Sequence, residues 1–170
     1  MSASPHPPVV RVLLVDDEPV VLTSLRETLR PEGYTIVLAN SPEEALESAR
    51  QHTFAVVVSD HQMPGMTGVE LLAEIRKLRP EAVRILVSAV PTTDVLVDAI
   101  NRARISRFIL KPWQREELVQ AVREGIARYQ QVTHDQLVLT TTTAMNETLH
   151  KLTESLQNQL EEQRTRQRVE

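Results

Sequence analysis

The sequence predicts an α/β fold, with a doubly wound, five-stranded parallel sheet, helices on both faces and a C-terminal helical tail. Three observations lead to this prediction. Five short apolar runs alternate with segments whose apolar residues recur at helical spacing. The runs are apolar at nearly every position, which is typical of parallel strands buried on both faces. An alternation of this kind predicts right-handed crossovers and a sheet that lies between two helical layers.

Each strand is expected where a short apolar run, rich in β-branched residues, reaches turn or polar residues. Aromatic residues make up only 3% of the chain, so the core around these strands is expected to be aliphatic. In order along the chain, the strands are expected at residues 9–15, 34–38, 54–59, 83–88 and 108–110.

Each helix is expected from apolar residues at helical spacing and from start or stop residues beside them. Pro19 is tolerated in the first turn of the first helix, and Pro31 and Gly33 end that helix. Ser41 caps the second helix, whose first turn holds Pro42 and two glutamates near the positive end of the helix dipole. The other helices are expected at about residues 69–78, from about residue 92 to residue 100, and at about residues 116–129.

Polar side chains are expected to gather at the carboxyl ends of the strands, the edge at which open parallel sheets bind ligands. Asp16 and Asp17 follow the first strand, Asp60 follows the third, Ser88 ends the fourth and Lys111 follows the fifth. Crowded carboxylates raise one another's pKa unless a cation neutralises them, and Mg²⁺ takes oxygen ligands of this kind. One carboxylate could then be the nucleophile toward a phosphoryl group, because in-line transfer needs mainly positioning and charge neutralisation.

Four short stretches carry a family resemblance: LLVDDEP, VVVSDHQMPGMTG, ILVSA and FILKPW. Each stretch alone is a weak signal, whereas four of them in this order, on these elements, are a strong one. Together they resemble the receiver domain of two-component response regulators, over about residues 9–130. The resemblance implies a flavodoxin-like sheet with strand order 2-1-3-4-5.

The resemblance also implies roles for the acidic residues. Asp60 looks like the phosphoacceptor and would itself be a Mg²⁺ ligand. Asp17 looks like a direct Mg²⁺ ligand and Asp16 like a ligand through water. The backbone carbonyl of Gln62 would complete the metal contacts that the protein provides.

Three further positions match the residues with which the family senses phosphorylation. Ser88 would donate a hydrogen bond to the incoming phosphoryl group, and Lys111 would pair with another of its oxygens. Ser88 would then move toward phosphorylated Asp60, and Phe108, the switch aromatic, would turn into the vacated space. The family also leads us to expect a cis peptide bond between Lys111 and Pro112.

The function implied is a signalling domain, not an enzyme that acts on external substrates. It would take a phosphoryl group from a sensor histidine kinase or a phosphotransfer protein and relay the signal to its C-terminal helix and to a partner or output domain. Two alternatives stay open: a Mg²⁺-dependent aspartyl-phosphate phosphohydrolase, and a receiver-like dimerisation module that works without phosphorylation. The first commonly needs a second Asp two residues after the nucleophile, where this chain has Gln62, which cannot transfer a proton.

Each polar residue of this group also has a structural interpretation. The aspartate pair could cap the first helix, Asp60 could stabilise a turn, Ser88 could be a loop hydroxyl and Lys111 an exposed charge. All four explanations would have to hold at once, so we adopt the interpretation that these residues form one site. For Phe108, a plain core aromatic is an equal alternative, and His61 is expected to be an exposed loop residue and not a ligand.

A heptad pattern follows the fifth helix and is expected to form a dimer seam. Val138 and Thr142 extend its register backward, and Gln159 and Gln163 continue it forward, with Leu160 beside it. We expect a homodimer through this tail, through the face of the fourth helix, fifth strand and fifth helix, or through both. The alternative is a solvated amphipathic helix that packs back on the receiver. The seam consists of Met145, Leu149, Leu152 and Leu156.

The tail is not in register with the apolar stripe of the fifth helix. A break is therefore expected between about residues 130 and 137, and the β-branched threonines at 140–143 mark a second weak point. The sequence has no stop signal at its end, which favours an output domain beyond residue 170. The expected organisation is a disordered lead-in at 1–8, a receiver domain at 9–130 and a helical linker or short coiled coil at 131–170.

Composition excludes several other classes of function. The chain has no cysteine, so thiol catalysis, disulfides and zinc–thiolate sites are excluded. The net charge of −4 gives no basic excess, so direct nucleic-acid binding is not expected. The sequence contains neither G-x-G-x-x-G nor a P-loop, and it has no signal peptide or apolar run long enough for a membrane span. A cytoplasmic location is therefore expected.

Overall fold

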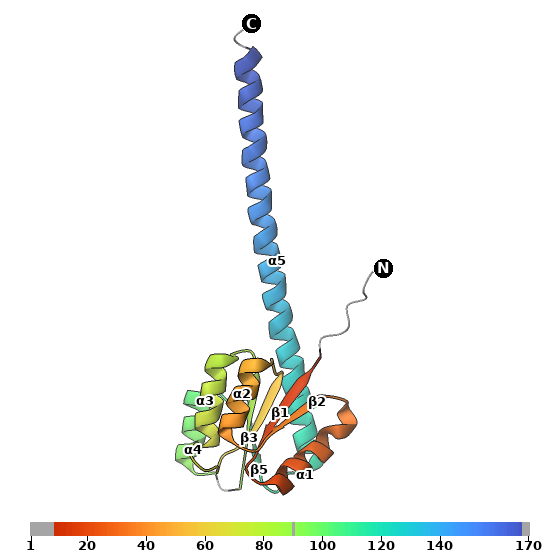
Figure 1. Ribbon diagram of the computed structural model, residues 1–170, viewed down its shortest axis with the longest axis vertical. Coiled ribbons are helices and arrows are strands. Elements are labelled where there is room, and N and C mark those ends of the chain that lie inside the picture. Colours follow the sequence, from red (N-terminus) through yellow and green to blue (C-terminus); the bar gives the residue numbers. More distant parts are fainter. Residues whose placement is uncertain (1–8, 90, 168–170) are drawn as a thin grey trace. The chain divides into compact units, whose positions relative to one another are not determined.

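The computed structural model describes residues 9–89 and 91–167, and its central element is a parallel sheet of five strands (Figure 1). The strand order is β2-β1-β3-β4-β5, and all neighbouring strands run parallel. This arrangement confirms the predicted fold and strand order. The strands are β1 (Arg11–Val15), β2 (Thr35–Ala39), β3 (Val56–Asp60), β4 (Val83–Ser88) and β5 (Arg107–Leu110).

The helices begin close to the predicted positions, and two of them end in irregular turns. Ser41 caps α2 as predicted, because its hydroxyl accepts a hydrogen bond from the Glu44 N–H. A 3₁₀ turn follows α1 and ends at Gly33, whose φ of 78° suits glycine. A π-helical turn follows α4 and ends at Arg104, with a φ of 45°. The elements are α1 (Pro19–Leu29), η1 (Arg30–Glu32), α2 (Pro42–Gln51), α3 (Gly68–Leu78), α4 (Thr93–Asp98), η2 (Ala99–Ala103) and α5 (Arg115–Gln167).

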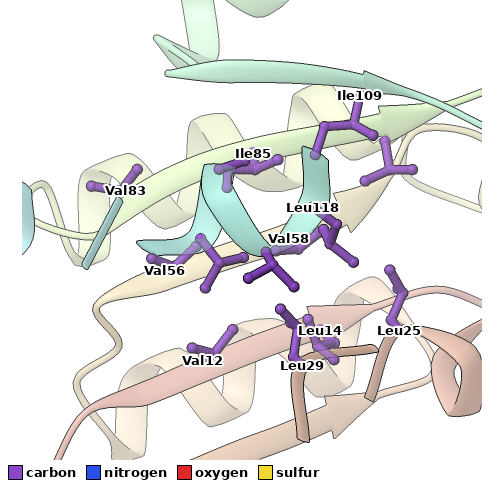
Figure 2. Close-up of a cluster of buried hydrophobic side chains, with 14 of the residues drawn as sticks. Val12, Leu14, Leu25, Leu29, Val56, Val58, Val83, Ile85, Ile109 and Leu118 are labelled. Atoms are coloured by element: carbon purple, nitrogen blue, oxygen red, sulfur yellow. The ribbon is translucent and has the colours of Figure 1, made fainter. Parts of the chain in front are cut away.

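The sheet separates two aliphatic cores, because alternate residues of each strand point to opposite faces. The core on one face lies under α1 and the first part of α5; Figure 2 labels Val12, Leu14, Leu25, Leu29, Val56, Val58, Val83, Ile85, Ile109 and Leu118 of it. The core on the other face lies under α2, α3 and η2 and takes the alternate strand residues Leu13, Val15, Val57 and Leu86. Since both faces are covered, the strands are apolar throughout, which is the pattern that the sequence shows.

Gly125 allows α5 to pack closely against the sheet. A Cβ atom at this position would lie 2.9 Å from the Val56 Cγ2 and 3.1 Å from the Val83 Cγ1. Any larger residue would therefore push this part of α5 away from β3 and β4. The contact fixes the distance between α5 and the strands that lead to the site.

A buried arginine on β4 holds the end of the α4–η2 segment. Arg84 is 8% exposed, and its Nε donates to the Ala103 carbonyl at 2.7 Å. Its Nη atoms donate to the carbonyls of Pro80, Ala82 and Arg104. Burial, followed by the charges of neighbouring arginines, lowers the pKa of Arg84 to about 10. The hydrogen bonds join the α3–β4 connection to the last carbonyls of η2, where the helix dipole is negative.

The predicted break between residues 130 and 137 is wrong, because α5 runs unbroken through this stretch. The threonines at 140–143 do not interrupt it either. Each of these four hydroxyls donates to the backbone carbonyl four residues earlier. A threonine costs a helix only a few tenths of a kcal/mol, and no Gly or Pro is present to end it.

The chain divides into two compact units, Met1–Gln131 and Val132–Glu170. The second unit is helical throughout residues 132–167, and its large apolar side chains are exposed. Within the described part of the chain, none of the helices combines the length and the apolar character that a membrane span requires. The lead-in predicted at residues 1–8 lies outside the described residues.

Candidate functional site

Strand register brings the predicted polar residues to one edge of the sheet. Val15 pairs with Ser59 and Asp60 pairs with Val87, so β1, β3 and β4 reach this edge together. Asp16, Asp17 and Asp60 each offer a carboxylate oxygen, and these oxygens lie within 4.8 Å of one another. The three acids therefore form one acidic pocket, as a hard divalent cation would require.

The two inner carboxylates are almost completely buried: Asp16 is 1% exposed and Asp60 is 6% exposed. The ammonium of Lys111 lies between them, 3.0 Å from the Asp16 Oδ2 and 3.0 Å from the Asp60 Oδ1. The Lys111 N–H donates to the Ser88 carbonyl at 3.0 Å, and its bond to Pro112 is cis, as expected. Lysine thus supplies the positive charge that keeps two buried acids together.

Asp16 is not the cap of α1. Its Oδ1 accepts a hydrogen bond from the Glu18 N–H at 2.9 Å, and Glu18 is the N-cap residue, without a side-chain cap hydrogen bond of its own. The capping interpretation of the aspartate pair is therefore wrong. The turn after β1 instead holds the Asp16 carboxylate inside the pocket.

Burial and charge shift the pKa values in the pocket. Burial raises the pKa of the Asp60 carboxyl, and the Asp16 charge adds to the rise, against the opposing effects of Lys111 and the His61 N–H. Burial alone would lower the pKa of Lys111, but its hydrogen bonds to Asp16 and Asp60 and their charges raise it above its ordinary value. Lys111 therefore stays protonated, and its charge partly offsets the rise that burial causes in the pKa of Asp60.

Ser88 contributes a buried hydroxyl at the end of β4. It is 1% exposed, and its Oγ makes no hydrogen bond within the described part of the chain. A buried hydroxyl without a partner costs about 1–3 kcal/mol, so such a group indicates an external acceptor. Ser88 ends β4, which pairs with β3, the strand that ends at Asp60.

The loop after Asp60 returns to it at Gly68, a contact that sequence analysis missed. A Cβ on Gly68 would overlap the Asp60 carbonyl and lie 2.8 Å from the His61 Cα. The Gly68 N–H donates to the His61 carbonyl at 2.8 Å, and Thr67 with Glu70 forms a capping box at the start of α3. A glycine directly after a Thr cap, followed by an apolar helix, is the signal that could have indicated this close approach.

The remaining predicted residues are placed less decisively. Phe108 is half-buried and packs against the core that contains Leu86, which is compatible with both of its interpretations. Gln62 has an exposed side chain in the loop after β3. His61 lies in the loop after β3 as expected, but the expectation that it is exposed is wrong: it is half-buried, and its Nδ1 is buried without a partner among the described residues.

Fold and site together define the class of the protein. A doubly wound parallel sheet carries three aspartates, a hydroxyl and a lysine at one edge, and this combination defines a receiver-type signalling domain. The sequence comparisons are independent of this geometry. Residues 12–123 match the response regulator receiver domain, and the chain belongs to this family.

Two transcriptional regulatory proteins are similar to this chain. The chain is 37% identical over 115 residues to the hydrogenase transcriptional regulatory protein HoxA of Cupriavidus necator, covering 68% of this chain but 24% of HoxA. It is 32% identical over 124 residues to the transcriptional regulatory protein PdtaR of Mycobacterium tuberculosis, covering 72% of this chain and 60% of PdtaR. The chain thus spans about a quarter of HoxA and less than two thirds of PdtaR.

A solved structure supports the fold. The signal receiver domain of an HD domain-containing protein from Pseudomonas fluorescens Pf-5 has a TM-score of 0.73 and 30% sequence identity, covering 79% of this chain and 98% of that chain. The receiver fold therefore accounts for nearly all of that solved domain.

Proposed function

We propose that Asp60 accepts a phosphoryl group from a sensor histidine kinase or a phosphotransfer protein, in the cytoplasm. One observation carries this proposal: Asp60 lies 3.0 Å from the Lys111 ammonium, and the Ser88 hydroxyl at the end of the next strand has no partner among the described residues. A phosphoryl group on Asp60 would bring new oxygens to both donors. The Asp60 carboxylate oxygen is the nucleophile, and the donor's leaving group departs as the new bond forms.

Mg²⁺ is the proposed cofactor, and the donor set fits it. Asp16, Asp17 and Asp60 would hold the ion, together with the backbone carbonyl of Gln62. When bound, Mg²⁺ would neutralise the negative charge that accumulates during phosphoryl transfer. Lys111 supplies a second positive charge from the end of β5 at the same edge, and the carboxylate oxygens are close enough together to share one ion.

The signal would leave the site through the face made by α4, β5 and α5. Ser88 moves toward phosphorylated Asp60, and Phe108 turns inward. No residue of α4 is fully buried, so this helix is held less firmly than its neighbours. Val97 and Leu110 are half exposed on this face and suit an apolar contact with a partner or a second copy.

We also propose that the second unit forms a homodimer. The seam residues Met145, Leu149, Leu152 and Leu156 are all more than half exposed, which is costly for a solvated helix. Burying them against a second copy removes this apolar surface from water. Signals would then pass from the receiver to α5 and its partner helix.

The deciding experiment is phosphorylation with a small phosphodonor in the presence of Mg²⁺, followed by intact mass spectrometry. Wild type is expected to gain one phosphoryl group, while Asp60→Asn gains none. Asp94→Asn serves as the control, because Asp94 is exposed at the start of α4, away from the pocket. Equal labelling of Asp60→Asn and wild type would contradict the assignment. The same partner affinity with and without phosphodonor would favour a receiver that works without phosphorylation.

A phosphohydrolase is the weaker candidate. The second residue after Asp60 is Gln62, which has no proton to exchange with a leaving group or water. We therefore expect no turnover of an external phosphate ester by the full chain. Multiple turnovers of such an ester, lost in Asp60→Asn, would revive this function.

A further inference from the structure

The exposed apolar residues of the second unit extend beyond the predicted heptad seam. Val138 is 50% exposed and Leu160 is 56% exposed, comparable to the four seam residues between them. Leu160 takes the place that a heptad repeat assigns to Gln159. We name the whole set the 138–160 stripe: Val138, Met145, Leu149, Leu152, Leu156 and Leu160.

The stripe follows an eleven-residue spacing at least as well as a seven-residue one. Val138, Leu149 and Leu160 are eleven residues apart, and so are Met145 and Leu156. At about 100° per residue, all six members of the stripe fall within an arc of about 80° on a straight helix. Gln159 lies about 60° from Val138 on that helix, outside this arc. Residues eleven apart shift by about 20° per repeat, in the direction opposite to the shift of a strict heptad seam, so the stripe stays close to the helix axis.

The charges of this segment all lie on the opposite side of the helix. Glu147, Lys151 and Glu154 are about 160° to 220° away from Val138 around the axis. The positions that flank the stripe carry neutral side chains, such as Thr148 and Thr153. The stripe and its flanks therefore offer no charged side chain to a partner with a charged binding face. The surface that complements an apolar stripe with neutral flanks is another copy of the same stripe, which meets it without like-charge repulsion.

We propose that the 138–160 stripe binds the same stripe of a second copy in parallel and in register, with Leu160 and not Gln159 in the last apolar layer. The proposal rests on the homodimer proposed above and specifies its geometry. The two helices then cross with a weak right-handed twist along the stripe, because eleven-residue spacing favours a right-handed supercoil and not the left-handed one of heptads.

Orientation follows from the one polar position inside the stripe. In a parallel, in-register pair, each apolar residue faces its own copy and Thr142 faces Thr142. An antiparallel pair places Thr142 opposite Leu156 or Gln159, depending on the register. Parallel pairing therefore keeps the largest number of apolar side chains in contact with one another.

The absence of cysteine from the chain makes disulfide mapping a clean test. Single-cysteine variants of the full chain are made at Leu156, Leu160, Gln159 and Glu154 and are oxidised with and without phosphodonor. The expected result is rapid disulfide formation in Leu156→Cys and Leu160→Cys, and slow formation in Gln159→Cys and in the outward-facing control Glu154→Cys. Faster cross-linking at 159 than at 160 would overturn the eleven-residue spacing while leaving the dimer intact.

A second arm tests orientation and the dimer itself. Met145→Cys and Leu156→Cys are mixed and oxidised; a parallel pair gives only the two homodisulfides, whereas a mixed Met145–Leu156 disulfide overturns the parallel arrangement. Sedimentation of the wild-type chain is run alongside. A monomer at every concentration, with no cross-link at 156 in either phosphorylation state, overturns the dimer and the stripe together. The phosphorylation of Asp60 is measured separately and does not depend on this result.

Discussion

The Lys111 ammonium lies 3.0 Å from the Asp60 carboxylate and joins the segment after β5 to the end of β3. It also lies 3.0 Å from Asp16, so one cation compensates two buried acids. Before any phosphoryl group arrives, the pocket is thus held together by the residue that would later bind that group. Removing this single charge should affect both stability and phosphorylation.

Lys111→Met is expected to lower the free energy of unfolding by on the order of 2 kcal/mol in Mg²⁺-free buffer, because two buried carboxylates lose their counter-charge. Added Mg²⁺ should restore part of the loss, since an ion that binds only the folded state stabilises it. The initial phosphorylation rate should fall by about 10²-fold. Urea unfolding and a phosphorylation time course measure these effects. Lys77→Met, which removes an exposed ion pair with Glu74, is the control and should change neither the stability nor the phosphorylation rate.

Ser88→Ala should separate stability from signalling. Because the Ser88 Oγ has no partner among the described residues, its removal should leave the unphosphorylated protein equally stable or up to about 1 kcal/mol more stable. Partner or dimer affinity should respond less to phosphodonor. Ser59→Ala is the matched control: its buried hydroxyl donates to the Asp60 carbonyl at 2.8 Å, so its loss should cost about 1 kcal/mol. A larger loss of stability in Ser88→Ala than in Ser59→Ala would contradict our assignment of the free hydroxyl.

Gly68→Ala should damage the acceptor without touching a charged group. The new Cβ would overlap the Asp60 carbonyl, which is backbone and cannot move aside cheaply, so a loss of about 2 kcal/mol or more is expected, together with slower phosphorylation. Gly33→Ala is the control, because its Cβ meets open space and only its φ of 78° opposes the change. That variant should lose about 1 kcal/mol and phosphorylate normally. Normal phosphorylation of Gly68→Ala would show that the close approach is not needed.

Acid should weaken the contact between η1 and α5. The Arg123 guanidinium donates two hydrogen bonds to Glu32, at 2.7 and 2.8 Å, and holds the pKa of that carboxyl below its ordinary value of 4.5. A lowered folded-state pKa gives stability that is present above pH 4.5 and is lost as the pH falls further. Glu32→Gln should therefore be less stable than wild type at pH 7, and the difference should shrink below pH 4.5. Arg123→Gln should lose a similar amount of stability, and the double variant should be little less stable than either single variant. Urea unfolding at several pH values measures these differences.

The sequence was sufficient for the sheet order and for the gathering of the polar residues at one edge, but not for the tail or the irregular turns. Asp60, Ser88 and Lys111 were predictable because their strands end in recognisable motifs and parallel strands share one edge. The unbroken course of α5 was not predictable from the sequence. The apolar stripe shifts to another face of the helix near residue 130, and we took this shift for a break. A helix can continue while its apolar face changes. The Gly68 contact and the cage around Arg84 depend on backbone atoms far apart in the chain, which no local pattern encodes.

Arg84 is a charged residue inside the apolar run VRILVS, so its burial requires acceptors for its guanidinium. Its guanidinium donates to four backbone carbonyls, two of them at the end of η2. Arg84→Met should leave these carbonyls without their donor and cost about 2–4 kcal/mol.

The loss should be local as well as global, because α4 has no fully buried residue and depends on η2 for its attachment. Hydrogen exchange in residues 93–104 should therefore accelerate more in Arg84→Met than exchange in α2, while Arg102→Met, an exposed residue paired with Asp98, should change neither. Uniform acceleration across the domain would mean that Arg84 stabilises the core and does not anchor α4. A selective effect would instead identify β4 as the strand that links the two parts of the switch, with Ser88 at one end and the α4 anchor at the other.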